Sequence, residues 1–200
     1  MNVKKLFSKV FKNLFTKLPS YPNVPVEELV DIEVIKPKEK DMSFMYFNGS
    51  PKFKKFDWKY IVLHHSQSPD KDETAQMGDL RKWHMDENGW DYIGYHYVIE
   101  KVGDNYEIIQ ARPLIMNGAH EPTRNYDGIG ICVIGNFDKE EMPAEAQERL
   151  AILVRTLQVQ NDIDDDHVVL HRDFAKKSCP GTKFDRDAFI NDYLHQVEVA

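Results

Sequence analysis

The chain has 200 residues, of which 42% are hydrophobic and 12% aromatic, enough for one domain with a core plus an extension. Its formal net charge of -7 argues against general nucleic-acid binding, and its two cysteines argue against a disulfide framework and are compatible with a reducing compartment. No secretory signal is visible, because lysines interrupt every N-terminal apolar stretch, and no segment approaches the roughly 20 apolar residues of a transmembrane helix.

The first 18 residues predict a basic amphipathic helix. Apolar side chains of residues 3–18 fall on one half of a helical wheel, whereas Lys5, Lys9 and Lys12 fall on the other half. Residues 1–18 contain five lysines and no acidic residue. This pattern is typical of a helix that lies on an anionic membrane surface or docks on a protein partner. The alternative is that the apolar face packs on the rest of the chain.

Residues 19–57 predict a proline-containing linker or extension. Pro19, Pro22 and Pro25 end the helix and stiffen the chain that follows. We therefore expect the folded domain to occupy residues 58–200.

Strands and helices alternate in residues 58–200. Strands are predicted at 59–65, 94–102, 105–113, 129–137 and 167–171, with a tight turn at Gly103-Asp104. Helices are predicted from about residue 73 to Gly89, over 143–161 and over 185–196. This order predicts an α/β fold with a central mixed β-sheet flanked by helices.

Two of the predicted strands end in histidine, and a cysteine follows the second one. The first ends in the segment IVLHHS at 61–66, and the second in VVLHRD at 168–173, whose His171 lies eight positions before Cys179. Imidazole nitrogen and thiolate sulfur are zinc ligands, and three protein ligands leave a fourth position for water. Since α/β proteins place their sites at strand ends, the pattern predicts a catalytic zinc site there.

The residues alone leave two choices open. His64 and His65 point to opposite faces of a strand, so only one of them is a ligand, and spacing does not say which. Cys179 is alternatively a nucleophile with His171 as its base, or an inert structural cysteine.

Six motifs occur in the order found in type 2 N-acetylmuramoyl-L-alanine amidases, which the chain resembles over roughly residues 58–190. They are IVLHHS, a WH-containing helix ending in NGW, GYHYVIE, GAH, IGICVIGNF and HRDFAKKSCPG. That family includes zinc-dependent phage endolysins and animal peptidoglycan-recognition proteins. The resemblance does not extend to residues 1–57.

The resemblance implies a role for five residues. It implies that Zn²⁺ is bound by His64, His171 and Cys179, and that Tyr95 and Lys177 are catalytic. Zinc lowers the pKa of bound water to about 7 and polarises a carbonyl, while a lysine and a hydroxyl stabilise developing negative charge. On residue type alone, a solvated loop lysine is the favoured interpretation of Lys177 and a core aromatic that of Tyr95, and the motif is what favours catalytic roles.

The loop from Asn117 to Asp127 supplies the candidate substrate contacts. Asn117, His120 and Arg124 are predicted to line a groove for sugar or peptide, the alternative being a polar surface cluster.

The expected function is zinc-dependent hydrolysis of the lactyl–L-alanine amide of peptidoglycan by a phage-type lytic enzyme. Such an enzyme stays in the host cytoplasm until it is released to the cell wall. The alternatives are a peptidoglycan-recognition module with little turnover, or a regulatory module that binds a protein partner.

Overall fold

The computed structural model describes residues 46–47, 50–51, 56–69 and 76–198, and the chain divides into two compact units, Met1–Phe53 with Ala200 and Lys54–Val199. In the first unit, the short strands β1 (Tyr46–Phe47) and β2 (Ser50–Pro51) pair antiparallel. The helix predicted for residues 3–18 and most of the predicted linker lie outside the described residues. Within the described residues, no helix has the length and apolar character needed to cross a membrane.

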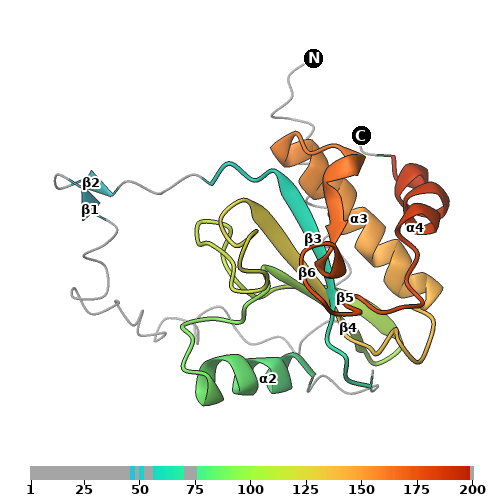
Figure 1. Cartoon of the computed structure of the whole chain (residues 1–200), viewed down its shortest axis with the longest axis horizontal. Helices are drawn as coiled ribbons and strands as arrows, with labels where there is room; N and C mark the ends of the chain where they lie inside the picture. The colour runs from blue at the N-terminus through green and yellow to red at the C-terminus, as the bar shows by residue number, and fades with distance from the viewer. Residues whose placement is uncertain (1–45, 48–49, 52–55, 70–75, 199–200) are drawn as a thin grey trace, which may run out of the picture. The chain divides into compact units, whose positions relative to one another are not determined.

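The second unit is built on a five-stranded sheet with the order β5-β4-β6-β3-β7 (Figure 1). Its strands are β3 (Tyr60–His65), β4 (Tyr97–Val102), β5 (Asn105–Gln110), β6 (Gly128–Val133) and β7 (Val168–Leu170). The β4–β5 hairpin is antiparallel, whereas β3 pairs parallel with β6 and β7, and β4 pairs parallel with β6. The predicted mixed sheet is therefore confirmed.

Three helices accompany the sheet. They are α2 (Gln76–Arg81), which continues as a π-helical turn over Lys82–Glu87, α3 (Ala144–Asn161) and α4 (Arg186–Asp192). Single 3₁₀ turns cover Asp165–His167, His171–Asp173 and Leu194–Gln196. The helix predicted to stop at Gly89 ends two residues earlier, and its predicted start near residue 73 lies outside the described residues.

Local sequence explains where several elements begin and turn. The Asp185 carboxylate accepts hydrogen bonds from the backbone N–H groups of Asp187 and Ala188, which caps α4. The β4–β5 turn has Gly103 at φ +61°, a left-handed conformation that glycine adopts without a Cβ penalty. The strand predicted at 94–102 begins only at Tyr97, so Tyr95 and His96 lie in the segment that leads into β4.

The sheet has a different core on each face. On one face the main core joins the odd-numbered β3 residues Ile61 and Leu63 to α3 residues such as Leu150 and Val154. On the other face a smaller cluster joins Leu80 of α2 to Ile93, Val98, Cys132 and Ile134. Helices on both faces bury the central strands, and β6 is buried at every position, as expected for strands in parallel pairing. The two strand-end histidines of β3 therefore face different surroundings.

Candidate metal and catalytic site

Parallel pairing of β3 with β7 brings the two histidine motifs together. Leu63 is paired with Leu170, so the next residues, His64 and His171, emerge at the same edge of the sheet. Their ring centroids are 4.5 Å apart, and the two residues are only 1% and 8% exposed. Sheet register alone thus assembles two nitrogen ligands.

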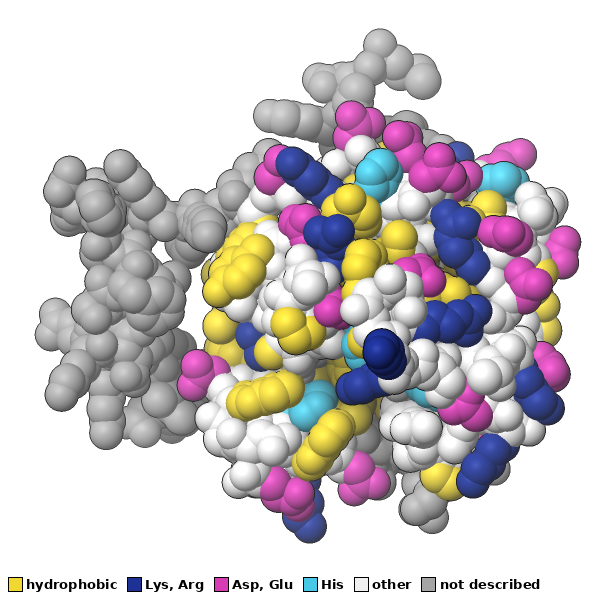
Figure 2. Space-filling model, in the orientation of Figure 1, with side chains coloured by type: hydrophobic (Ala, Val, Ile, Leu, Met, Phe, Trp, Pro, Cys, Tyr) yellow, Lys and Arg dark blue, Asp and Glu magenta, His cyan; other side chains and the backbone are white. Residues whose placement is uncertain are grey.

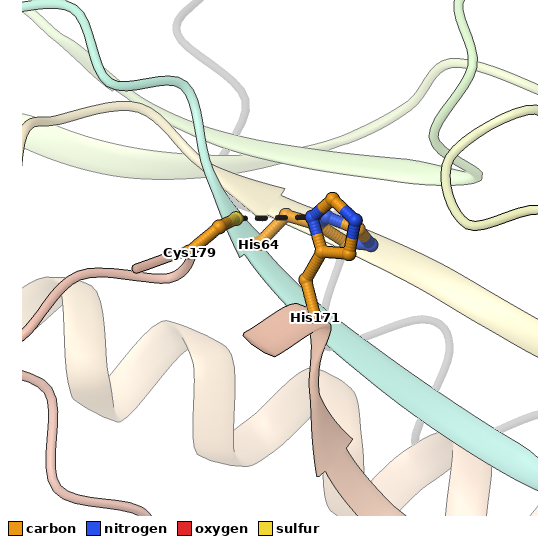
Figure 3. A group of neighbouring side chains, drawn as sticks. All are labelled: His64, His171 and Cys179. Carbon is orange, nitrogen blue, oxygen red and sulfur yellow. Dashed lines mark hydrogen bonds between the residues drawn. The ribbon is translucent and has the colours of Figure 1, made fainter. Parts of the chain in front are cut away.

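The Cys179 thiol completes this cluster (Figure 3). Its Sγ accepts the backbone N–H of His65 at 3.4 Å and lies 3.7 Å from His64 Nδ1. One ligand atom from each of His64, His171 and Cys179 lies within 4.8 Å of the others. Ligand atoms around a tetrahedral zinc ion, with bonds of about 2.0 to 2.3 Å, are about 3.3 to 3.7 Å apart. The donor set suits zinc and the 3.7 Å distance between His64 Nδ1 and Cys179 Sγ matches this spacing, whereas separations of up to 4.8 Å would have to shorten on binding.

His65 lies on the other face of β3. Its Nδ1 accepts the backbone N–H of Phe137 at 3.2 Å, and its ring lies 6.0 Å from the Phe137 ring. The choice that sequence spacing left open thus has a geometric answer, since His64 is the residue beside His171 and Cys179.

Two charged residues outside the predicted set hold the loop that carries Cys179. The Asp138 carboxylate accepts the Ser178 hydroxyl at 2.7 Å and the Thr182 N–H at 2.9 Å. The Arg172 guanidinium donates to backbone carbonyls further along the same loop. Asp138 directly follows the IGICVIGNF motif, and Arg172 lies within HRD. This proximity to the motifs is the sequence feature from which their role could have been predicted.

The surroundings of the cluster favour neutral side chains. Burial, followed by the charges of His120 and His171, lowers the pKa of His64 well below its ordinary value. Burial and then Lys177 lower the pKa of His171. Burial raises the pKa of the Cys179 thiol to about 11, although the His65 N–H and Lys177 act in the opposite direction. The imidazoles are thus ready to coordinate, whereas zinc binding must release the Cys179 proton.

The two candidate catalytic residues flank the cluster. The Tyr95 ring lies 5.0 Å from the His64 ring. Burial, followed by Cys132 and Cys179, raises the pKa of Tyr95 well above its ordinary value, and its hydroxyl hydrogen-bonds with Cys132. Tyr95 therefore stays a neutral hydrogen-bond donor.

Lys177 is exposed, on the loop that leads to Cys179. Its charge lowers the pKa of each of the three clustered residues, His64, His171 and Cys179, which places it within electrostatic reach of all of them. Its neighbour Lys176 is exposed as well.

The three candidate substrate contacts have different surroundings. His120 Nδ1 lies 3.1 Å from His64 Nε2, so His120 joins the cluster. The Arg124 guanidinium lies over the rings of Tyr60 and Phe174, at 4.2 and 4.8 Å from their centroids, and pairs with Asp127 at 3.2 Å.

The Asn117 amide donates to the backbone of Gly118. Within the described residues, the hydrogen bonds and ring contacts therefore bring only His120 of these three to the candidate metal cluster. The substrate-binding roles of all three stay predictions.

A buried carboxylate follows His120 in the chain. Glu121 is 2% exposed, and one of its oxygens accepts both the N–H and the hydroxyl of Thr123. Its charge raises the pKa of His171. Glu121 was not predicted from the sequence, where a lone acidic residue in a polar loop carries no signal.

Exposed aromatic side chains lie beside the cluster. Trp83 and Trp90 are 52% and 39% exposed, and each ring lies 4.8 Å from the His84 ring, which is in turn 5.7 Å from Tyr95. Figure 2 shows histidine, basic and hydrophobic side chains gathered on one face. The exposed rings of Trp83 and Trp90 are suited to contact with the apolar surfaces of sugars and peptides.

Comparisons with known proteins agree with this architecture. Residues 54–182 match the family model described as N-acetylmuramoyl-L-alanine amidase. The chain is 32% identical to the N-acetylmuramoyl-L-alanine amidase of Sus scrofa, over 72% of this chain and 24% of that protein. It is 27% identical to the endolysin of Enterobacteria phage T3, over 60% of this chain and 78% of the endolysin. The chain thus spans about a quarter of the pig protein and most of the phage protein.

Solved structures show the same fold. The N-acetylmuramoyl-L-alanine amidase LysC from Clostridium intestinale superimposes with a TM-score of 0.57 and 27% identity, over 76% of this chain and 95% of that one. Wild-type Drosophila peptidoglycan-recognition protein LB superimposes with a TM-score of 0.60 and 26% identity, over 74% and 88%. A point mutant of that Drosophila protein has been solved in complex with tracheal cytotoxin.

Proposed function

Because the chain belongs to the N-acetylmuramoyl-L-alanine amidase family, we propose that it hydrolyses the amide bond between the lactyl group of muramic acid and L-alanine in bacterial peptidoglycan. The observation that carries the proposal is the convergence of His64, His171 and Cys179 at one sheet edge, with Tyr95 and Lys177 beside them. We propose Zn²⁺ as the cofactor, held by the three convergent side chains.

Each part of the site has a task in amide hydrolysis. Bound zinc supplies a Lewis acid that polarises the carbonyl and makes water a nucleophile near neutral pH. The Lys177 ammonium offsets the negative charge that develops on the carbonyl oxygen. Tyr95, kept protonated by its raised pKa, would exchange its hydrogen bond with Cys132 for one to the same reacting group.

The test is digestion of purified peptidoglycan by the full chain, with mass spectrometry of the products and elemental analysis of the protein. We expect about one zinc per chain, and stem peptides with a free L-alanine amino terminus. New reducing sugar ends would show a glycosidase instead and contradict the proposal. A Cys179→Ala variant is the matched control, and it should lose both the zinc and the products.

Peptidoglycan recognition with little turnover is the second candidate. It is favoured by the similarity to peptidoglycan-recognition proteins and by the exposed Trp83 and Trp90. The same digest separates the two functions, since a recognition module binds the polymer without releasing peptides. Loss of a protein partner's activity on addition of the chain would instead indicate a regulatory role.

The endolysin relatives support a further proposal, that the chain has a phage-type lytic role. The matched regions cover 78% of the phage T3 endolysin and 84% of the Escherichia phage T7 endolysin. An enzyme of this type accumulates in the host cytoplasm and acts after release to the cell wall. Added protein should clear suspensions of bacteria whose cell wall has been made accessible, and unchanged turbidity with active enzyme would contradict a lytic role.

The lysine-rich residues 1–18 suit a separate docking role. Their apolar half-wheel and five lysines match helices that lie in an anionic lipid interface or on a protein partner. The full chain should bind anionic vesicles at low salt and ignore neutral ones, and a variant lacking residues 1–24 should bind neither. Equal binding by both proteins would contradict the assignment to this segment.

A further inference from the structure

The His120 ring occupies a slot that two glycines leave open. A Cβ atom added at Gly118 or at Gly130 of β6 would collide with the ring. The backbone N–H of His120 is fixed as well, because it donates to the Asn125 side-chain oxygen at 2.8 Å. The ring is therefore held from both sides in one orientation.

Both nitrogens of this ring have hydrogen-bond partners. Nε2 lies 3.1 Å from the Gly128 carbonyl oxygen, and Nδ1 lies 3.1 Å from His64 Nε2. A carbonyl oxygen only accepts, so His120 Nε2 carries the proton. In a neutral imidazole the other nitrogen is then an acceptor, so His64 Nε2 must donate to His120 Nδ1.

This chain of bonds determines which nitrogen of His64 is available. With its proton on Nε2, His64 has a free lone pair on Nδ1, and Nδ1 is the nitrogen that lies 3.7 Å from Cys179 Sγ.

We propose that His120 is a positioning residue for the metal site. Its Nε2 donates a hydrogen bond to the Gly128 carbonyl, its Nδ1 accepts a hydrogen bond from His64 Nε2, and together these bonds direct the His64 Nδ1 lone pair toward the metal. The proposal rests on the zinc site described above. Groups that orient a metal-bound histidine in this way typically change metal affinity by about 10- to 100-fold.

His84 provides a contrast from the same face of the sheet. Its Nδ1 also accepts a hydrogen bond, from the backbone N–H of Gly94 at 3.2 Å, and it is 3% exposed. Its ring lies against those of Trp83, Trp90 and Tyr95, none of which is a metal ligand. His84→Asn is therefore a matched control for the loss of a buried, hydrogen-bonded imidazole.

The first experiment reads the tautomer of His64 directly. Long-range ¹H–¹⁵N spectra of the metal-free full chain should show the His64 proton on Nε2, and the His120 proton also on Nε2. A His64 proton on Nδ1 would overturn the proposal. This readout needs neither zinc nor turnover, so it stands even if the proposed amidase activity fails.

The second experiment measures zinc affinity by competition with a chelator. His120→Ala should bind zinc about 10- to 100-fold more weakly than the wild type. His120→Asn places an amide oxygen where Nδ1 lies, so it should restore affinity close to that of the wild type. His120→Gln places its amide nearer the position of Nε2 and should not restore it.

The pair of amide variants separates positioning from packing. Wild-type affinity in both His120→Ala and His120→Gln, or equal loss in Asn and Gln, would overturn the proposal. The His84→Asn control should keep wild-type affinity. If His120→Ala does not fold, the zinc affinities of the Asn and Gln variants and the His64 tautomer in the wild type still test the proposal. A wild-type chain that binds no zinc would instead contradict the proposed function.

Discussion

The two faces of the sheet at the end of β3 differ although neighbouring histidines supply them. His64 meets the rings of His120, His171 and Tyr95, whereas His65 meets the backbone and ring of Phe137 on the side of the α3 core. The residue type is the same, and only the alternation of side chains along a strand separates them. Strand register, and not residue chemistry, therefore decides which histidine joins the candidate metal site and which packs against the core.

Exchanging either histidine for alanine tests this contrast most strongly. His64→Ala should lose stoichiometric zinc and all measurable hydrolysis, because one of three ligands is gone. His65→Ala should keep zinc but lose about 1 to 3 kcal/mol of stability, since the buried Phe137 N–H loses its acceptor. Elemental analysis and denaturant unfolding of both variants measure this, and loss of metal from His65→Ala alone would reverse the assignment.

The exposed lysine pair offers the next largest effect. Lys177→Ala should reduce the hydrolysis rate by about 100- to 1,000-fold with zinc retained, as for loss of one group that stabilises the oxyanion. Lys176→Ala is the control on the same loop and should keep the wild-type rate. Rates on peptidoglycan at matched zinc content give the comparison. Equal rates in the two variants would show that Lys177 is a solvated loop residue without a catalytic role.

Lowering the pH should reduce the stability of the fold through its buried histidines before it protonates the carboxylates. Burial lowers the pKa of His96 to about 4 and that of His120 to about 3. Between pH 6.5 and 4 these two imidazoles bind protons in the unfolded chain but remain neutral in the folded chain. The free energy of unfolding therefore falls as the pH falls, by up to about 1.4 kcal/mol per pH unit for each group.

Denaturant unfolding of the metal-free full chain at pH 7, 6 and 5 measures this slope. Asp138 and Asp165 have lowered pKa values and lose their contribution only below their ordinary value of 3.8, outside this window. His120→Asn should reduce the slope, because one buried imidazole is removed. Stability that stays constant from pH 7 to 5 would contradict the prediction.

The smallest expected effect is a loss of stability from a change in the loop that carries Ser178 and Cys179. Ser178→Ala removes the hydroxyl bond to Asp138 and should cost about 1 kcal/mol of stability while zinc is retained. Thermal unfolding measures the shift. A larger loss, accompanied by loss of zinc, would show that this bond holds Cys179 itself.

Elements with local signals were predictable from the sequence. The β4–β5 hairpin follows from Gly103 between two apolar runs, and α3 follows from apolar periodicity after Pro143, the residue immediately before the helix. The closeness of the two histidine motifs followed from strand ends, because parallel neighbours end at one edge of a sheet, whereas the choice of His64 over His65 came from the family resemblance.

Contacts set by tertiary register were not predictable. His120 meets His64 because β6 places Gly130 under the ring, a relation between three separate segments. The Arg124 side chain was predicted to line a groove, and its contacts with the rings of Tyr60 and Phe174 come from distant parts of the chain. Nothing in the local sequence of either loop residue encodes these partners.

The wide separation of the ligands along the chain has a consequence for folding. His64 and Cys179 are 115 positions apart, and β7 is an edge strand held to β3 by three paired residues. A metal ion bound at both ends closes most of the domain into one loop. In the chain-entropy view, a cross-link around a loop of about 100 residues lowers the entropy of the unfolded chain by an amount worth about 4 to 5 kcal/mol. The proposed zinc would therefore also cross-link the segment after β7 to the end of β3, and its removal would lower the stability of the fold as well as abolish hydrolysis.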